Sequence, residues 1–431
     1  MISNNLDINE VGHLTINGYD TLALASEYKT PLYLMDEDRI RENCRLYQTA
    51  MQKYFGSNAL PLYASKAACF KALYRIIKEE GLGIDVVSSG EIYTAYKAQF
   101  PLDKAYFHSN NKTKDDIAFA MKHQVGYFVV DGIDELNAIE KIANELNIVQ
   151  KVLLRLTPGI DPHTFEAVKT GKVDSKFGSA IETGQAEEIT RYCLTLDHLK
   201  LMGYHCHIGS QIFDIDPYER TIDIVFDFLV DMQNKLDYTA KELNLGGGFG
   251  VRYTDQDPVI DIEDNIKNLA KIIKKHLEKG NLPLPGIRLE PGRSIVADAG
   301  MTLYTVGSVK NIPGYKNYVS IDGGMTDNPR FALYGSKYTV CNAGKMNEKP
   351  SIKYDVVGRC CESGDIIQKD VILPETRYDD TIAVLTTGAY NYSMASNYNR
   401  LCRPPIVMLT KHKLYIAVKR ESLDYLIKND I

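Results

Sequence analysis

Short apolar runs alternate with amphipathic stretches along most of the chain. Eight runs rich in β-branched and aromatic residues lie at 60–66, 83–89, 104–109, 126–132, 151–158, 201–209, 242–248 and 286–292. Between them, apolar residues recur every three or four positions, which predicts helices with one buried face. The clearest examples lie at 136–146, 222–229 and 262–277. Because parallel strands need crossovers and no edge strand is left over, the pattern predicts a closed (β/α)8 barrel.

The pattern changes after Pro291 to strand-like segments separated by turns, with few helical stretches. These segments lie at 303–312, 317–324, 353–359, 380–388 and 405–419. They predict a second, all-β domain. The run PLYLM at 31–35 precedes a helix-like stretch and is expected to pair with that domain. We therefore predict a barrel over 36–291 and a β domain built from 1–35 and 292–431.

The composition is that of an ordinary globular protein, with 44% apolar and 25% charged residues among 431. A net charge of −6 gives no basic surface for nucleic acid. No apolar run approaches the roughly 20 residues of a membrane span, and the amino terminus lacks the apolar core of a secretory signal. The eight cysteines contain no C-x-x-C pair, which favours reduced thiols over disulfides or a metal site. We expect a soluble, cytoplasmic protein that binds neither nucleic acid nor membrane and has no metal centre.

Polar residues at the carboxyl ends of the predicted strands carry the candidate chemistry, because barrel active sites lie at that end. Lys66 follows the apolar strand ALPLYAS, where it is either a solvated residue at the rim or an amine that forms a Schiff base. The glycines at 246–248 form a tight turn or present backbone N–H groups to a phosphate. Glu290 and Arg293 form a surface ion pair or contact a cofactor ring and its phosphate.

His207, in HCHIGSQ, is on its own more typical of a satisfied polar core residue than of a ligand or stacking group. Together with the other polar groups at the barrel mouth, however, His207 is more typical of a group that stacks on a cofactor. A lysine, an imidazole that can stack on a ring, a glycine turn and a Glu–Arg pair at one barrel mouth are what pyridoxal phosphate requires. The sequence therefore predicts a barrel that binds pyridoxal phosphate.

Eight motifs in a fixed order then indicate a family. They are YASKA around Lys66, PGIDPHT with TGKVDSKFG, GYHCHIGSQI, LGGGFG, EPGRSIV, DGGMTDNPRFALY, CCESGD and TGAYNYSMAS. With these motifs the chain resembles the fold-type-III, alanine-racemase-like pyridoxal phosphate-dependent decarboxylases over residues 30–400. Within that family it is most similar to members that act on meso-2,6-diaminopimelate. The resemblance implies release of CO2 from the D-configured carbon to give L-lysine, the last step of lysine biosynthesis.

The resemblance also implies roles for residues of the barrel. Lys66 would hold the cofactor covalently, His207 would stack on its ring, and Glu290 would pair with the ring nitrogen and keep it protonated. The other cofactor-binding residues that it implies are Asp85, Arg155, Ser210, Gly246, Gly247, Gly248, Gly292, Arg293 and Tyr390.

In this family the active site is shared between the subunits of a homodimer. The resemblance implies that Cys361 protonates the carbanion and that Glu362 binds the distal ammonium of the substrate, both reaching the site from the neighbouring subunit. The spacing to ESGD selects Cys361 over the adjacent Cys360. The substrate-binding residues implied are Arg293, Arg330, Tyr334, Glu362 and Tyr390.

One departure from the family pattern lies in HSNNK at 108–112. Many relatives have a glycine before the Asn pair, where this chain has Ser109. The departure is expected to alter the pocket wall at His108 without removing a chemical role.

Three alternatives involve proteins with the same barrel. A decarboxylase of ornithine, lysine or arginine, as in polyamine synthesis, needs an acidic group for a distal cation and no guanidinium, so Arg330 beside Tyr334 favours the dicarboxylate. A racemase would place an arginine against the ring nitrogen, where this chain has Glu290. A non-catalytic cofactor-binding barrel would lack the β domain.

Overall fold

The computed structural model of the protein describes residues 2–160 and 175–431. Most of PGIDPHT and the first half of TGKVDSKFG lie outside the described residues. The chain forms two compact units. One comprises Met1–Asn43, Val251–Val259 and Arg293–Ile431, and the other comprises Cys44–Gly250 and Ile260–Gly292.

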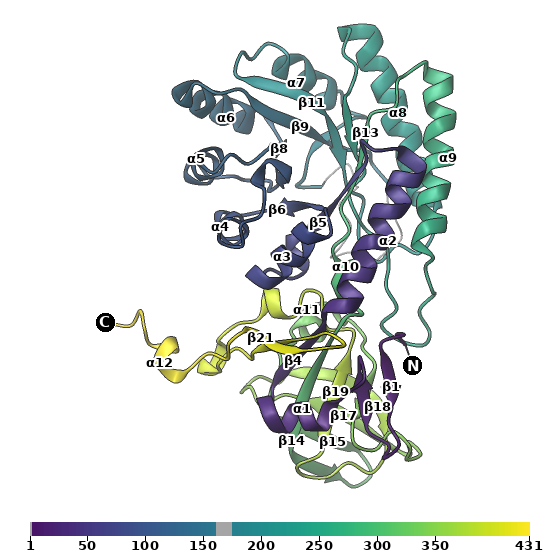
Figure 1. The fold of residues 1–431 in the computed structure, drawn as a ribbon, viewed down its shortest axis with the longest axis vertical. Coiled ribbons are helices and arrows are strands. Elements are labelled where there is room, and N and C mark those ends of the chain that lie inside the picture. The colour runs from purple at the N-terminus through teal and green to yellow at the C-terminus, as the bar shows by residue number, and fades with distance from the viewer. Residues whose placement is uncertain (1, 161–174) are drawn as a thin grey trace. The chain divides into compact units, whose positions relative to one another are not determined.

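The second unit is a closed barrel of parallel strands (Figure 1). Its strands are β5 (Leu60–Ala64), β6 (Gly83–Val86), β7 (Ala105–Phe107), β8 (Tyr127–Val130), β9 (Gln150–Thr157), β11 (Leu199–Cys206), β12 (Glu242–Asn244) and β13 (Gly286–Leu289). Each strand pairs with the next along the chain, and β13 pairs with β5 to close the ring. A two-residue strand, β10 (Ser179–Ala180), extends the pairing of β9. Every predicted strand is present, and the prediction of a (β/α)8 barrel is confirmed.

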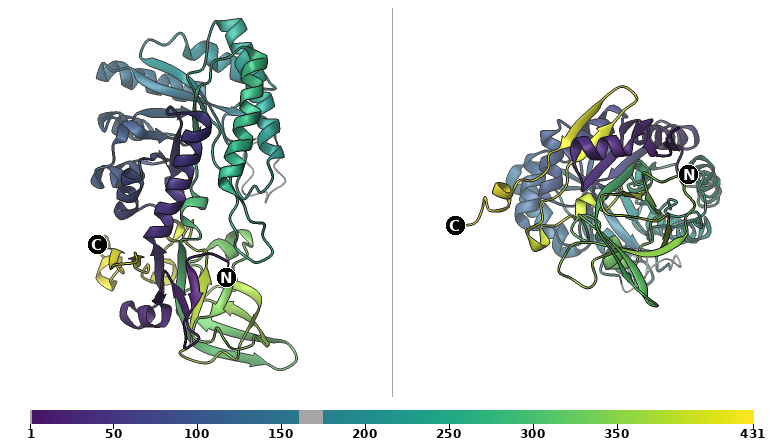
Figure 2. Two further views of the ribbon diagram at one scale, coloured as in Figure 1. Left: turned by 45° about the vertical axis from the view of Figure 1, so that its right-hand side comes forward. Right: turned by 90° about the horizontal axis from the view of Figure 1, so that it is seen from below.

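Helices cover the outside of the barrel strands (Figure 2). They are α3 (Lys71–Glu79), α4 (Ser89–Lys97), α5 (Lys114–Lys122), α6 (Ile133–Leu146), α7 (Gln185–Cys193), α8 (Asp216–Leu236) and α9 (Ile262–Gly280). The periodic apolar residues explain their orientation. In α9, for example, Ile266, Leu269 and Ile273 are buried on one face, while the lysines between them are not.

The first unit is built mainly from β-strands. A sheet contains β4 (Leu32–Asp36), β14 (Gly300–Ile312), β15 (Lys316–Ile321), β16 (Val340–Asn342), β17 (Ile352–Val357), β18 (Ile366–Leu373), β19 (Thr381–Leu385), β20 (Ile406–Leu409) and β21 (Leu414–Val418). A smaller sheet contains β1 (Leu6–Ile8), β2 (Leu14–Ile16) and β3 (Tyr19–Asp20). The helices of the unit are α1 (Thr21–Tyr28), α10 (Arg293–Val296), α11 (Arg330–Tyr334) and α12 (Leu423–Leu426).

The amino-terminal strand β4 belongs to this β sheet, as predicted from PLYLM. It pairs antiparallel with β14 and parallel with β20. Leu32, Leu34, Leu303 and Val407 are fully buried in the core that results. This apolar core explains why the first residues of the chain fold with the last hundred, and the prediction of an all-β domain that includes the amino-terminal segment is confirmed.

Some elements were not predicted. Strand β18 escaped notice because Gln368, Lys369 and Asp370 interrupt its apolar residues, and Asp370 has a φ of 57°. Helix α2 (Glu37–Phe55), by contrast, matches the helix-like stretch expected after PLYLM, and it begins in one unit and continues in the other. None of the helices formed by residues 2–160 and 175–431 is long and apolar enough to cross a membrane.

Candidate active site

Six polar side chains gather at the carboxyl ends of the barrel strands. They are Lys66 after β5, Asp85 on β6, His108 after β7, Arg155 on β9, His205 on β11 and Glu290 after β13. Because parallel strands end at the same rim, the topology alone brings these residues together. All of them except Lys66 are buried, with 8% or less of each residue exposed. Lys66 is exposed at the rim.

The carboxylate of Glu290 is held by groups from three neighbouring strand ends. Asn244 Nδ2 donates to Glu290 Oε1 at 2.7 Å, and His205 Nε2 lies 3.1 Å from Oε2. His108 Nε2 lies 2.8 Å from Oε1, at ion-pair distance although its N–H is not aligned for a regular hydrogen bond. The same Nε2 lies 3.8 Å from Asp85 Oδ1, which has no hydrogen-bond partner.

The pKa values of the two imidazoles beside Glu290 shift in opposite directions. Burial disfavours the charged form of both rings. At His108 the carboxylates of Asp85 and Glu290 outweigh burial and raise the pKa. At His205 burial prevails and lowers the pKa to about 4, so this ring is neutral at ordinary pH. Burial alone would raise the pKa of Glu290, but the two histidines hold it well below its usual range, so its carboxylate is ionised.

The glycine turn after β12 adjoins His207. Gly247 N–H donates to His207 Nδ1 at 3.2 Å, and Gly246 N–H donates to Asn244 Oδ1 at 2.9 Å. Among the described residues, Gly248 N–H is therefore the one amide of the three without a partner. A Cβ at Gly247 would lie 2.2 Å from the carbonyl oxygen of Glu290, so a side chain there would clash with the backbone.

These features fit the predicted cofactor. His207 accepts at Nδ1 and burial lowers its pKa well below the ordinary value, so the ring is neutral and suited to stacking. Glu290 supplies an ionised carboxylate for a protonated ring nitrogen, and Gly248 supplies an amide for a phosphate. His108, His205 and Glu290 also place ligand atoms within 4.8 Å of one another, an arrangement that occurs in metal sites. The raised pKa of His108 opposes metal binding, because only a neutral imidazole is a ligand.

Four of the predicted residues gather in the β unit. The guanidinium of Arg293, which follows Gly292 directly, lies 4.7 Å from the centre of the Tyr390 ring, and that of Arg330 lies 5.1 Å from the same ring. Arg330 also lies 5.2 Å from the Tyr334 ring. Arg293 Nη1 donates to Tyr253 Oη at 2.6 Å. Two buried cations thus flank one aromatic ring.

Arg330 has no acidic partner within the described part of the chain. It is 7% exposed, its Nε has no hydrogen-bond partner, and its Nη2 makes only a 3.5 Å contact with Ser336 Oγ. Burying a guanidinium without a carboxylate is costly. The arrangement therefore indicates a site for an anionic group of a ligand.

The two adjacent cysteines lie in a loop after β17. Cys361 and Glu362 are exposed, whereas Cys360 is half-buried. Asp365 is buried and shapes the loop, because its carboxylate accepts from Met325 N at 2.6 Å and from Cys360 N at 2.7 Å. Burial and Asp365 raise the pKa of Cys360 to about 11. No ion pair or ring contact joins Cys361 or Glu362 to the Arg330 group in the residues that the structure describes.

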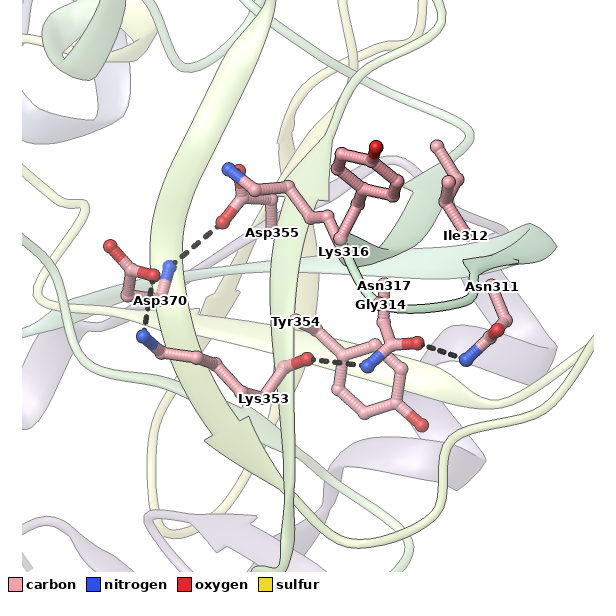
Figure 3. A pocket seen from close by; sticks show the side chains of 10 residues that line it. Asn311, Ile312, Gly314, Lys316, Asn317, Lys353, Tyr354, Asp355 and Asp370 are labelled. Atoms are coloured by element: carbon pink, nitrogen blue, oxygen red, sulfur yellow. Dashed lines mark hydrogen bonds and ion pairs between the residues drawn. The ribbon is translucent and has the colours of Figure 1, made fainter.

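The β unit also contains a pocket of ≈ 330 Å³ beside the turn between β14 and β15 (Figure 3). Its charged residues are already paired. Lys316 Nζ lies 2.7 Å from Asp355 Oδ2, and Lys353 Nζ lies 2.9 Å from Asp370 Oδ1. None of the predicted site residues lines it.

Sequence reasoning did not assign roles to His108, His205, Asn244 and Tyr253. His108 and His205 stand at strand ends and were recognisable as polar rim residues, but the partner of each became clear only in three dimensions. Asn244 offered a weaker signal, a lone polar residue that ends a buried strand just before the glycine run. Tyr253 lies in the segment Val251–Val259, which belongs to the β unit although it follows a barrel strand. No sequence pattern indicated that this segment belongs to the β unit.

Comparison with known proteins covers both units. Residues 37–297 match the family model described as pyridoxal-dependent decarboxylase, pyridoxal binding domain. The diaminopimelate decarboxylase of Bacillus methanolicus is 44% identical over 416 residues, which cover 96% of each chain. That of Bacillus subtilis is 42% identical over 423 residues, 98% of this chain and 96% of the relative. The solved structure of diaminopimelate decarboxylase from M. jannaschii with L-lysine has a TM-score of 0.91 and 34% identity, and the match covers 99% of this chain and 98% of that one.

Proposed function

The chain belongs to the diaminopimelate decarboxylase family of pyridoxal phosphate-dependent enzymes, and from this premise we propose that it converts meso-2,6-diaminopimelate to L-lysine and CO2, the last step of lysine biosynthesis. The barrel binds the cofactor, and residues of the β unit select the substrate. We place the barrel at 36–291 and the β domain at 1–35 and 292–431, limits that avoid cutting α2.

Pyridoxal phosphate, when bound, supplies an electron sink that accepts the electron pair left behind as the substrate carboxylate departs as CO2. Glu290 stabilises a proton on the ring nitrogen, because its ionised carboxylate is fixed by Asn244 and His205. His207 packs its neutral ring on the cofactor face. Lys66 Nζ provides the amine for covalent attachment at the exposed rim.

Further cofactor contacts complete the barrel site. Gly248 N–H would be available to the phosphate, and the glycines before it keep side chains out of the turn. Asp85 and Arg155 set the electrostatic field around Lys66 and His207. The remaining proposed phosphate and ring contacts are Ser210, Gly246, Gly247, Gly292, Arg293 and Tyr390.

The observation that carries the substrate assignment is the buried guanidinium of Arg330 with no carboxylate partner in the described chain. A distal carboxylate on the substrate would satisfy it, together with Arg293 and the hydroxyl of Tyr334. Among the amino acids considered, meso-2,6-diaminopimelate has that group, while ornithine, lysine and arginine do not. A charge-assisted contact of this kind discriminates strongly, because the wrong substrate leaves the buried donor unpaired.

We propose that the active unit is a homodimer with shared active sites. Cys361 and Glu362 are exposed on their loop, which suits residues that enter the barrel of a partner subunit. In that arrangement Cys361 Sγ delivers a proton to the carbon that has lost CO2, and Glu362 takes the distal ammonium. All eight cysteines are free thiols, which supports a reducing, cytoplasmic environment.

Chiral analysis of the product tests this proposal. The protein is supplied with pyridoxal phosphate and meso-2,6-diaminopimelate, and the lysine formed is resolved by chiral chromatography. L-lysine is expected in equimolar amount with CO2, because the D-configured carbon loses its carboxylate. D-lysine, or lysine without CO2, would contradict the proposed reaction.

A further inference from the structure

His108 occupies a position that the proposed reaction does not yet use. It follows β7, is 5% exposed, and its Nε2 faces both the carboxylate of Glu290 at 2.8 Å and that of Asp85 at 3.8 Å. Asp85 Oδ1 has no hydrogen-bond partner in the described chain. A nearby positive charge stabilises a buried carboxylate oxygen without a donor, and His108 Nε2, 3.8 Å away, can supply one.

The other groups around His108 do not neutralise both carboxylates. His205 packs against it with ring centroids 4.8 Å apart, but this ring is neutral. Burial raises the pKa of Asp85, and three cations oppose that shift, His108 most strongly and then Lys66 and Arg155. Asn244 donates to Glu290 but carries no charge. The imidazole between two carboxylates is therefore the group that carries the balancing proton.

The backbone at His108 is held in place by an unusual local structure. The next residue, Ser109, has a φ of 133°, a region that L-residues rarely adopt. The buried ammonium of Lys112 fixes this turn, because it donates to Ser109 O at 3.0 Å, to Val129 O at 2.7 Å and to Glu135 Oε1 at 2.6 Å. A strained turn that is clamped in this way persists only when the surrounding structure enforces it. It fixes the backbone directly after His108, while the His108 N–H donates to Val86 O at 2.7 Å.

We propose that His108 is a positioning residue whose imidazolium, shared between Asp85 and Glu290, keeps the Glu290 carboxylate ionised and oriented toward the ring nitrogen of the cofactor. The inference rests on the proposed function for its catalytic consequence. Its structural part, a positively charged His108, does not depend on the proposed function. The raised pKa of His108 and the lowered pKa of Glu290 agree with this arrangement.

Nitrogen NMR of the full-length protein tests the charge directly. Imidazole ¹⁵N shifts are recorded between pH 6 and 9, with and without pyridoxal phosphate, and the His108 signals are assigned by their loss in His108→Gln. Both ring nitrogens of His108 are expected to remain protonated above pH 7, whereas those of His205 show a neutral ring. A neutral His108 at pH 7 in the protein without cofactor would overturn the proposal.

Kinetics of the same variant test the catalytic consequence. Glutamine keeps an N–H donor near the place of Nε2 but removes the charge. We expect His108→Gln to bind the cofactor, to lose about 100-fold in kcat and to change KM by less than about threefold. The matched control is His198→Gln, which removes an imidazole from a His–Glu pair on the same barrel, with Nδ1 of His198 2.8 Å from Glu140 Oε1. A His108→Gln protein with the kcat of the control would contradict the positioning role.

The NMR titration and the CO2 assay distinguish a failure of this inference from a failure of the proposed function. If the unmodified protein releases no CO2 from any of the amino acids named above, the proposed function fails, while the NMR titration still decides the charge of His108. If it releases CO2 normally and His108 is neutral, the proposed function stands and the inference fails.

Discussion

The guanidinium carbon of Arg330 lies 5.1 Å from the centre of the Tyr390 ring, and Tyr390 has a φ of 64°. A bulky residue in the left-handed region is uncommon, and such outliers cluster at functional sites. The cation has no acidic partner in the described residues, so the tyrosine ring is one of the few favourable contacts that it makes. This pairing agrees with the proposed role of Arg330 in binding a carboxylate of the substrate.

Replacing Arg330 by methionine should separate the substrates. The variant keeps the volume but loses a charge-assisted contact that only a distal carboxylate makes, so kcat/KM for meso-2,6-diaminopimelate should fall about 100-fold. Residual activity on lysine or ornithine should change little. Arg377→Met, at an exposed arginine paired with Glu375 in the same unit, is the control. An equal loss on all substrates would show that Arg330 supports the fold instead of binding the carboxylate.

Glu290→Gln should separate cofactor binding from turnover. The neutral amide cannot stabilise a protonated ring nitrogen, so kcat should fall by about two orders of magnitude or more. Lys66 and the phosphate contacts are unchanged, and the visible absorbance of bound cofactor should persist. Near-normal kcat with cofactor bound would refute the role of Glu290 and favour the unprotonated ring of a racemase.

Ser109→Gly should stabilise the protein. At a φ of 133° a serine costs about 1–3 kcal/mol, which glycine relieves at a smaller entropic cost in the unfolded chain. We expect the melting temperature to rise by about 2 °C. The control is Ser57→Gly, at an exposed serine that lies outside the positive-φ region and should lose stability. A lower melting temperature for Ser109→Gly would mean that the serine side chain contributes more than the strain costs.

Mixing two inactive variants should restore activity if the sites are shared. Lys66→Ala removes the cofactor amine and Cys361→Ala removes the proposed proton donor, so hybrid dimers would contain one intact site. Up to about a quarter of wild-type activity is expected after subunit exchange, because half of the dimers are hybrids and each has one working site. Lys66→Ala mixed with Glu290→Gln is the control, since both lesions fall in the barrel and no intact site can form. Recovery equal to that control would rule out the shared site.

The two adjacent thiols should differ in reactivity. Burial and Asp365 raise the pKa of Cys360 to about 11, so this residue stays protonated at pH 8, while Cys361 is exposed. Iodoacetamide should therefore alkylate Cys361 first, and activity should fall in step with that modification. The Cys360→Ser variant should retain its activity, and iodoacetamide should still alkylate Cys361 and inactivate the variant. Peptide mapping that finds Cys360 modified first would reverse the assignment of the thiol.

The sequence predicted the barrel because each strand and helix carries its own periodic signal. It also predicted which strand ends carry polar groups, since parallel topology fixes that rim. It could not predict that His108 contacts Glu290, because β7 and β13 are not neighbours in the sheet and the contact depends on how side chains pack at the barrel mouth. Nor did the glycine run reveal that Gly246 and Gly247 use their N–H groups within the chain, a consequence of where Asn244 and His207 lie.

The most direct test of the account is the rate of CO2 release from four amino acids by the protein loaded with pyridoxal phosphate. With Arg330 buried and unpaired until a carboxylate binds, kcat/KM for meso-2,6-diaminopimelate should exceed that for L-lysine, L-ornithine and L-arginine by about 10⁴-fold. A kcat/KM for any of these three that equals or exceeds the value for meso-2,6-diaminopimelate would contradict it.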